Sequence, residues 1–255
     1  MKQLTCLTIA LCASLALGLT AFAGPEPMPS GKEMKQVAPA PPECNWTGFY
    51  IGLNVGGQWG HSEDVDNDYN FENPKPWGYD QSGVIAGGQV GYNFQWNWLV
   101  LGIEGDLGYM NTDGSGVEPG SPGGDTHGET SSDFYTTIRG RLGVAFGHWL
   151  FYGTGGGIGV NQETRVIDDC DTGPCGDERI NAGQTNFNWG WTAGGGIEYM
   201  FGCHWTIKGE YLRYQLGEES FSGEATFFGT PEGRFNFHAP GTEGNIVRAG
   251  LNYKF

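Results

Sequence analysis

The last nine residues of the chain alternate strictly between apolar and polar or small side chains. In an extended strand, this alternation sends successive side chains to opposite faces. One face would carry Val247, Ala249, Leu251, Tyr253 and Phe255, and the other Arg248, Gly250, Asn252 and Lys254. The pattern recurs in seven further segments, and no amphipathic helical segment is present to cover the apolar faces. The alternation therefore predicts a barrel whose apolar face points towards lipid and whose polar face lines the lumen.

The N-terminal 45 residues divide into two parts that precede this pattern. Residues 1–23 combine Lys2, an apolar run and the small-x-small sequence Ala21-Phe22-Ala23, which predicts a secretory signal cleaved near Ala23. Residues 24–45 are rich in proline and predict an extended periplasmic linker. The remaining residues 46–255 hold no apolar run near the roughly 18 residues that a spanning helix needs. Any membrane crossing must then be made by a closed sheet, which we expect residues 46–255 to form.

Eight segments carry the alternation, and their connections alternate in length. The segments are 46–59, 84–95, 98–110, 133–146, 150–160, 187–201, 205–215 and 245–255. Short connections fall around Asn97, His148 and Cys203, and long ones cover 60–83, 111–131, 161–186 and 216–244, the last with a hairpin of its own. This predicts an all-β, eight-stranded, antiparallel up-and-down transmembrane barrel with short periplasmic turns and long extracellular loops.

Tryptophans gather at the ends of these segments. Trp46, Trp96, Trp98, Trp149 and Trp205 lie near the short turns, and Trp59, Trp189 and Trp191 lie near the long connections. Tryptophan favours the two interfaces of a membrane. We therefore expect two aromatic girdles, one at each rim of the barrel.

Charge is divided between the long connections and the predicted lumen. The formal net charge of −16 becomes −17 when the signal with its one charge, Lys2, is removed. The four long connections carry −5, −4, −4 and −4, which accounts for all of it. The polar faces of the segments hold both signs, and we predict a lumen charge network of Glu104, Asp106, Arg139, Arg141, Glu198, Lys208, Glu210, Arg248 and Lys254. Eight strands leave only enough interior for side chains to fill, so these charges must neutralise one another.

Four cysteines follow the signal, and export permits their oxidation. Cys170 and Cys175 fall in one long connection, and Cys44 and Cys203 fall at the short-turn rim. We expect one disulfide within each pair, provided that the rim pair can approach within about 7 Å between Cα atoms.

The sequence contains only weak matches to motifs for metal binding or catalysis. Asp64, Asp66 and Asp68 begin like a calcium loop, but Tyr69 replaces the turn glycine and Lys75 the bidentate glutamate, so we expect only weak divalent binding. The five histidines show no metal-ligand spacing. The sequence therefore predicts no catalytic residue, no cofactor and no specific metal site.

Five short motifs occur in one order along residues 46–255. They are Trp46-Thr47-Gly48-Phe49-Tyr50-Ile51-Gly52, Gly102-Ile103-Glu104-Gly105-Asp106, Arg139-Gly140-Arg141-Leu142-Gly143, Lys208-Gly209-Glu210-Tyr211 and the terminal segment from Arg248. In this order they resemble the opacity-type outer-membrane β-barrel family of Gram-negative bacteria. The resemblance implies an OmpA-like eight-stranded surface barrel, recognition of the terminal Tyr253 and Phe255 by the barrel-assembly machinery, and no catalysis.

Three functions are compatible with such a barrel. The favoured one is a structural, surface-presenting protein with a filled lumen, whose acidic loops meet an extracellular ligand. The alternatives are a narrow porin-like channel for ions or small solutes and an enzyme acting on outer-membrane lipid. The expected partners are outer-membrane lipid or lipopolysaccharide and the assembly machinery, but no nucleic acid.

Overall fold

The computed structural model describes residues 44–66, 77–117, 126–170, 178–227 and 230–255. Its strands are β1 (Gly48–Asp66), β2 (Trp77–Trp96), β3 (Leu99–Val117), β4 (Thr126–Phe146), β5 (Trp149–Cys170), β6 (Glu178–Phe201), β7 (Trp205–Leu216), β8 (Glu219–Phe227), β9 (Thr230–Ala239) and β10 (Glu243–Lys254). In these residues, no helix has the length and apolar character that a membrane span requires.

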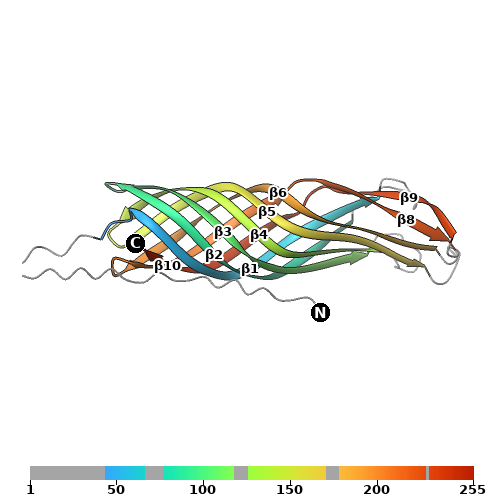
Figure 1. Ribbon diagram of the computed structural model, residues 1–255, viewed down its shortest axis with the longest axis horizontal. Helices are drawn as coiled ribbons and strands as arrows, with labels where there is room; N and C mark the ends of the chain where they lie inside the picture. The colour runs from blue at the N-terminus through green and yellow to red at the C-terminus, as the bar shows by residue number, and fades with distance from the viewer. Residues whose placement is uncertain (1–43, 67–76, 118–125, 171–177, 228–229) are drawn as a thin grey trace, which may run out of the picture. The chain divides into compact units, whose positions relative to one another are not determined.

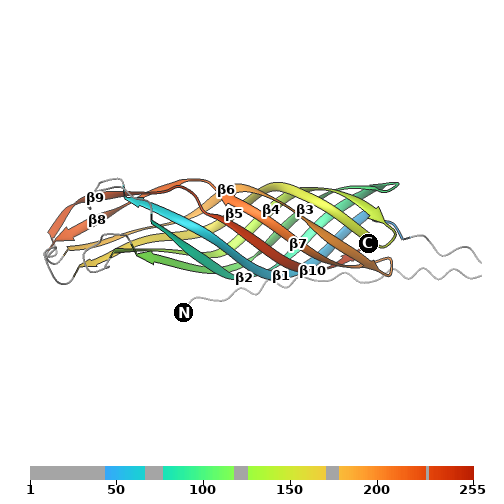
Figure 2. The ribbon, with the colours of Figure 1, turned by 180° about the vertical axis from the view of Figure 1, so that it is seen from behind.

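Eight of the strands form a closed antiparallel ring. Strands β1 to β6 each pair with the next strand, β7 pairs with β10, and β10 pairs with β1 to close the ring. Tyr50 of β1 lies opposite Lys254 of β10, so the two ends of the barrel chain meet at this seam. Figures 1 and 2 show the ring from opposite sides. The predicted all-β, eight-stranded antiparallel architecture is confirmed.

The remaining two strands form the hairpin expected in the last long connection. Strands β8 and β9 pair with each other, and their outer edges pair with β6 and β1. The hairpin thus continues the wall beyond the ends of the short strands β7 and β10, at the end of the barrel away from the C-terminus (Figure 1).

The strands at this end are much longer than the apolar alternation predicts. Strand β5 reaches Cys170 rather than residue 160, and β6 begins at Glu178 rather than residue 187. Much of each long connection is therefore sheet. Lipid-facing apolar residues reveal only the part of a strand that crosses the membrane, and above it the outward face is polar and looks like loop. The added wall has an apolar core of its own, Tyr79, Val166, Ala182 and Phe237.

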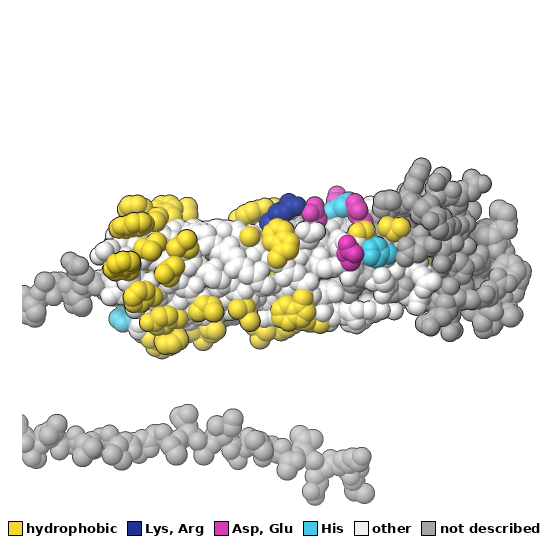
Figure 3. All heavy atoms as spheres, turned by 90° about the horizontal axis from the view of Figure 1, so that it is seen from above, with side chains coloured by type: hydrophobic (Ala, Val, Ile, Leu, Met, Phe, Trp, Pro, Cys, Tyr) yellow, Lys and Arg dark blue, Asp and Glu magenta, His cyan; other side chains and the backbone are white. Residues whose placement is uncertain are grey.

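Within the ring, the apolar and polar faces point as predicted. Large apolar side chains such as Phe49, Leu53, Ile103 and Leu142 are exposed on the outside. In Figure 3 the apolar side chains gather on part of the wall, and charged and histidine side chains follow towards the far end.

The two aromatic girdles are also present, with one exception. Trp96, Trp98, Trp149 and Trp205 are exposed at the short-turn rim, and Trp59, Trp189 and Trp191 are exposed at the opposite rim. The expectation for Trp46 is wrong, because its side chain is only 2 % exposed and packs inside the barrel. Strand β1 begins two residues later, at Gly48, so the alternation of side-chain directions in a strand does not predict where Trp46 points.

Candidate functional site

Eight charged side chains lie together in the lumen, and we call this group the charged belt. Every member is at most 4 % exposed. The belt contains four carboxylates and four cations and is neutral: Glu104 and Asp106 of β3, Arg139 and Arg141 of β4, Glu198 of β6, Lys208 and Glu210 of β7, and Arg248 of β10. Alternate residues of a strand point to the same side, and every member of the belt is at a position whose side chain faces the lumen.

Arg139 is the centre of the belt. It lies directly opposite Glu104 in the β3–β4 ladder. Its Nη2 atom is 2.6 Å from Glu104 Oε1 and 2.8 Å from Asp106 Oδ2, and its Nη1 atom is 3.1 Å from Glu210 Oε1 across the lumen. One guanidinium therefore joins three carboxylates, two from the neighbouring strand and one from β7.

The other cations complete the pairing. Lys208 Nζ is 2.8 Å from Glu104 Oε1, and Arg141 Nη2 is 2.6 Å from Glu198 Oε2. Arg248 lies 2.9 Å from Asp106 and 2.5 Å from Glu210. Of the predicted neighbours, Glu104 contacts both Arg139 and Arg141, the latter at 3.4 Å. Asp106 contacts Arg139 and Arg248, while no ion pair joins Asp106 to Arg141 in the described residues.

Neutral side chains add hydrogen bonds to the belt, although the buried Nε atom of Arg141 has no partner among the described residues. The Tyr50 hydroxyl donates to Glu104 at 2.7 Å and accepts from Arg141 at 2.8 Å. Tyr152 donates to Glu210 at 3.0 Å, and its ring lies 4.0 Å from the Arg141 guanidinium carbon. Sequence reasoning did not single out Tyr152, although its inward position on β5 would have identified it. These hydrogen bonds lower the cost of burying the charges, because a buried polar atom without a partner is costly.

Two inward glycines make room for these tyrosines. A Cβ atom on Gly91 would lie 2.3 Å from the Tyr50 ring, and a Cβ atom on Gly196 would lie 2.6 Å from the Tyr152 hydroxyl. Both contacts are shorter than side chains tolerate. The glycines therefore permit the tyrosines to reach the belt across a narrow barrel.

Apolar layers lie on both sides of the charged belt. One layer is formed by Ile85, Met110, Tyr135, Ile158, Val160, Leu212, Tyr214, Leu216 and Ile246. The other is formed by Trp46, Val100, Ala145, Leu150, Tyr152 and Met200, with Cys44 against it. The described lumen thus has a stack of packed layers rather than one continuous polar lining.

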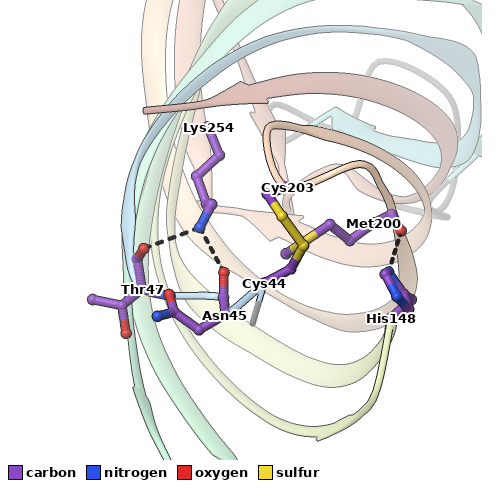
Figure 4. Close-up of a disulfide and its surroundings, with 7 residues drawn as sticks. All are labelled: Cys44, Asn45, Thr47, His148, Met200, Cys203 and Lys254. Atoms are coloured by element: carbon purple, nitrogen blue, oxygen red, sulfur yellow. Dashed lines mark hydrogen bonds between the residues drawn. A yellow bond between two sulfur atoms is a disulfide. The ribbon is translucent and has the colours of Figure 1, made fainter. Parts of the chain in front are cut away.

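The short-turn end is held by a disulfide and a lysine. Cys44 and Cys203 form a disulfide with 4.9 Å between their Cα atoms (Figure 4). Lys254 is buried on the inward face as predicted, but its predicted place in the lumen charge network is wrong. Its ammonium group lies at this end, where it donates to the carbonyl oxygens of Asn45 at 2.5 Å and Thr47 at 3.2 Å. The residues before β1 turn inwards and present these carbonyls to Lys254. Of the other cysteine pair, Cys175 lies outside the described residues, so that disulfide stays a prediction.

The terminal aromatic residues lie on the outside of the barrel. The Tyr253 ring centroid is 5.3 Å from that of Phe255 and 5.1 Å from that of Trp205. Phe255 is 72 % exposed. Both rings are therefore exposed on the outer face of the barrel.

The ends of the long strands and the β8–β9 hairpin form the part of the barrel beyond the girdle, which we call the outer wall. This outer wall carries paired histidines and carboxylates. His61 lies 3.0 Å from Asp80, and His127 lies 3.6 Å from Glu129. Within the described ranges, no group of three or more His, Cys, Asp and Glu side chains is arranged to hold a metal ion. Asp68, the third residue of the calcium-like run, is outside these ranges.

Comparison with known proteins gives consistent matches. The 31 kDa outer-membrane immunogenic protein of Brucella melitensis is 34 % identical over 219 residues, which cover 83 % of this chain and 84 % of that protein. The 22 kDa outer membrane protein of Rhizobium leguminosarum is 29 % identical over 86 % of this chain and 83 % of its own length. Among solved structures, the outer membrane protein OprG from Pseudomonas aeruginosa aligns with a TM-score of 0.48 and 11 % identity, covering 84 % of this chain and 98 % of that chain.

A family model described as the outer membrane protein β-barrel domain matches residues 10–255. This match covers nearly the whole chain, including all ten strands. The chain therefore belongs to the outer membrane protein β-barrel domain family and is an outer-membrane protein of a Gram-negative bacterium.

Proposed function

We propose that this protein is a closed outer-membrane barrel that presents its outer wall and acidic loops at the cell surface. The observation that carries the proposal is the charged belt, in which eight buried charges pair with one another between two apolar layers. The order of its sequence motifs supports a place among the opacity-type members of the family. Its relatives named as immunogenic outer-membrane proteins are consistent with exposure at the surface.

The belt argues against the channel alternative. A permeating ion would have to separate pairs such as Arg139–Glu104, which are 0 % exposed on both sides, and would leave desolvated charges behind. It would then have to cross the apolar layers. Closure of the lumen moves function to the outer surface, where the connections carry the whole net charge of the mature chain.

A conductance measurement tests this proposal. We expect the refolded protein in planar bilayers to show no reproducible unitary conductance. The conductance of the wild-type protein is compared with that of Arg139→Ala, which lacks the side chain that joins three carboxylates of the charged belt. Steady, ion-selective steps in the wild-type protein that disappear on substitution of Arg139 or Glu104 would establish a channel instead.

One side-chain arrangement bears on the enzyme alternative. Ser220 and His238 are opposite each other in the β8–β9 ladder, with 3.2 Å between Ser220 Oγ and His238 Nδ1. His238 Nε2 lies 3.8 Å from Glu218 Oε2. The order resembles a nucleophile, base and acid, but a catalytic site also needs a water-excluding pocket and oxyanion donors. Glu218 is 73 % exposed at its side chain, which supports a surface contact rather than a catalytic triad.

A fluorophosphonate probe, which labels activated serines, distinguishes a surface contact from a catalytic triad. We expect no labelling of Ser220 in the folded protein and the same background in Ser220→Ala and His238→Ala. Stoichiometric labelling that both substitutions abolish would show an activated serine.

The partners remain proposals at the level of chemistry. We propose that outer-membrane lipid, including lipopolysaccharide, surrounds the exposed apolar band, that the assembly machinery reads Tyr253 and Phe255, and that an extracellular ligand meets the acidic connections.

A further inference from the structure

A small pocket lies on the outside of the barrel, where β7, β10, β1 and β2 are neighbours in the wall. It has a volume of about 180 Å³, and we call it the girdle pocket. The strand ladders place its main residues in two adjoining rows. One row is Arg213, Asn245 and Trp59, and the other is Glu243, His61 and Asp80.

The side chains of the girdle pocket point away from the lumen. Trp59 is 47 % exposed, whereas Gln58 and Ser62 on the other face of β1 are 2 % and 4 % exposed. The side chains of Arg213 and Glu243 are about half exposed. The pocket is therefore open to molecules outside the barrel, and the charged belt does not contribute to it.

The girdle pocket is the first polar position beyond the apolar band. Two residues nearer the membrane, the outward side chains are Tyr211 of β7 and Val247 of β10. Charged side chains such as Arg213 and Glu243 are costly in hydrocarbon, and tryptophans such as Trp59 mark the interface. In Figure 3, charged and histidine side chains likewise follow directly on the apolar ones. The pocket thus lies where the hydrocarbon ends and the headgroups begin.

Two charged contacts hold the polar groups of the pocket in place. Arg213 Nη2 is 2.7 Å from Glu243 Oε2, and His61 Nδ1 is 3.0 Å from Asp80 Oδ1. A guanidinium has five N–H groups, and a carboxylate has two acceptor oxygens. These residues therefore keep both donors and acceptors for a ligand.

An amide and an indole complete the pocket. The Tyr211 hydroxyl donates to Asn245 Oδ1 at 2.6 Å. This bond orients the amide of Asn245 and leaves its nitrogen as a donor for a ligand. Trp59 lies directly opposite Asn245 in the β1–β10 ladder, so an aromatic side chain adjoins the polar groups.

We infer that the girdle pocket binds one uncharged pyranose ring of a glycan. Such a ring has a face of C–H groups, which packs on an aromatic face, and an edge of hydroxyls, which donate and accept hydrogen bonds. Trp59 and the polar groups around it supply the matching partners. The volume of about 180 Å³ suits a single ring, since pockets for larger ligands measure roughly 300–1,000 Å³.

The charge of the pocket disfavours other ligand classes. Two carboxylates, Glu243 and Asp80, accompany one guanidinium, Arg213, so a phosphate would meet a surplus of negative charge. An apolar ligand would desolvate these groups without giving them hydrogen bonds. A sugar hydroxyl can accept from the guanidinium and donate to either carboxylate.

The inference does not rest on the closed lumen, because the pocket would be present on the outside of a conducting barrel too. It rests on the proposed exposure at the cell surface only for the source of the sugar. The position at the lipid boundary favours a ring carried by a glycolipid of the same leaflet, such as lipopolysaccharide, over a soluble glycan.

Ligand-observed NMR on the whole protein tests the pocket. The detergent must have no sugar headgroup, since a glucoside or maltoside would compete. The probes are methyl β-D-glucopyranoside, methyl β-D-galactopyranoside and methyl N-acetyl-β-D-glucosaminide. We expect saturable saturation transfer to at least one probe, strongest at the C–H protons of one ring face, with a dissociation constant of about 1 mM. No saturable transfer to any probe up to about 50 mM would overturn the site.

Glucose 6-phosphate tests the charge of the ligand. We expect it to bind no more tightly than the methyl glucoside, because its phosphate would approach the carboxylates of Glu243 and Asp80. Binding that is at least about tenfold tighter would identify an anion site and overturn the inference.

Two matched pairs of variants locate the binding. Trp59→Leu removes the aromatic face, and Trp189→Leu makes the same change in another exposed tryptophan of the outer girdle. Arg213→Ala removes the guanidinium of the pocket, and Arg165→Ala removes one from the exposed pair that it forms with Glu163 at 2.6 Å.

We expect binding to be at least about tenfold weaker in Trp59→Leu and Arg213→Ala, and unchanged in the controls Trp189→Leu and Arg165→Ala. Heat-modifiable gel mobility verifies that each variant is folded. Equal loss within a pair would assign the effect to the girdle or to surface charge in general and would overturn the pocket.

Lipid nanodiscs distinguish the two sources of the sugar. Lipopolysaccharide in the disc holds its sugars at high local concentration beside the pocket. We therefore expect the glycoside that binds best in detergent to bind at least about tenfold more weakly in such discs than in discs of phospholipid alone. Equal binding in both discs would assign the pocket to a soluble glycan. Failure of every probe in detergent would overturn the pocket and leave the proposed function, which conductance tests, intact.

Discussion

At the scale of single residues, the charged belt is a network in which most members have two or more partners. Glu104 alone accepts from Tyr50, Arg139 and Lys208 within 2.8 Å. A buried charge without a partner is far more costly than an exposed one. The residues of the belt therefore depend on one another, and removal of one member is felt by the rest.

We expect Arg139→Ala to lower the free energy of unfolding by roughly 3–5 kcal/mol, because Glu104, Asp106 and Glu210 lose a shared cation. Adding Glu104→Ala restores neutrality of the belt and should recover part of this loss. Reversible urea unfolding in lipid vesicles gives the free energies for the complete double-mutant cycle. Additive effects of the two substitutions would show that the pair is not coupled.

An exposed ion pair supplies the matched control. Arg213 lies 2.7 Å from Glu243, with both side chains about half exposed. Water screens such a pair, so Arg213→Ala should cost less than about 1 kcal/mol in the same assay.

At the scale of elements, the hairpin β8–β9 and the ends of the long strands form an outer wall with its own core. Phe237 of β9 is 2 % exposed and packs with Tyr79, Val166 and Ala182 from β2, β5 and β6. This cluster is separate from the apolar layer next to the charged belt. The outer wall should therefore loosen without unfolding of the membrane-spanning ring.

We expect Phe237→Ala to destabilise the outer wall locally by roughly 3–5 kcal/mol, because a buried ring is lost from a small cluster. Limited chymotrypsin digestion should cut the β8–β9 hairpin faster, while the remaining barrel keeps its folded gel mobility. Val117→Ala, which truncates an exposed side chain at the same end of β3, should leave digestion unchanged. Loss of folded mobility in Phe237→Ala would mean that the wall and the ring unfold as one unit.

At the scale of the whole molecule, the Cys44–Cys203 disulfide links the chain before the first strand to the last short turn. It spans a sequence separation of 159 residues, which includes strands β1 to β6. A cross-link of this length removes much of the freedom of the unfolded chain. Together with Lys254, it also holds residues 44–47 at the short-turn end, where Trp46 fills the lumen.

Reduction should consequently lower the free energy of unfolding by up to about 5 kcal/mol, on the chain-entropy model. Urea unfolding with and without dithiothreitol measures the difference. The double variant Cys44→Ser/Cys203→Ser should resemble the reduced protein and should no longer respond to reductant. A response that persists in this variant would place the redox effect elsewhere, at Cys170 and Cys175.

Local alternation was enough to predict the eight membrane strands, the outward apolar faces and the inward positions of the belt. This works because odd- and even-numbered residues of a strand point to opposite faces. Lipid outside selects apolar residues on one face, and the narrow lumen selects polar or small residues on the other, so the residue types show which face each side chain takes. The partners across the lumen, such as Arg139 with Glu210 and Lys208 with Glu104, depend on how the closed ring brings distant strands together. The alternation along one strand cannot predict which residues of other strands lie opposite it across the lumen.

The sequence by itself thus determined which residues face lipid and which face the lumen. Only the tertiary structure decided two further features: Trp46 and Lys254 at the short-turn end, and the outer wall. Trp46 lies outside a regular strand, and the outer wall lies outside the apolar band, so neither carries the alternation that reveals a strand in lipid. The wall continues past the end of β7 at Leu216 because β8 follows β7 alongside β6, and strand pairing over such a distance is a property of the closed barrel rather than of any segment.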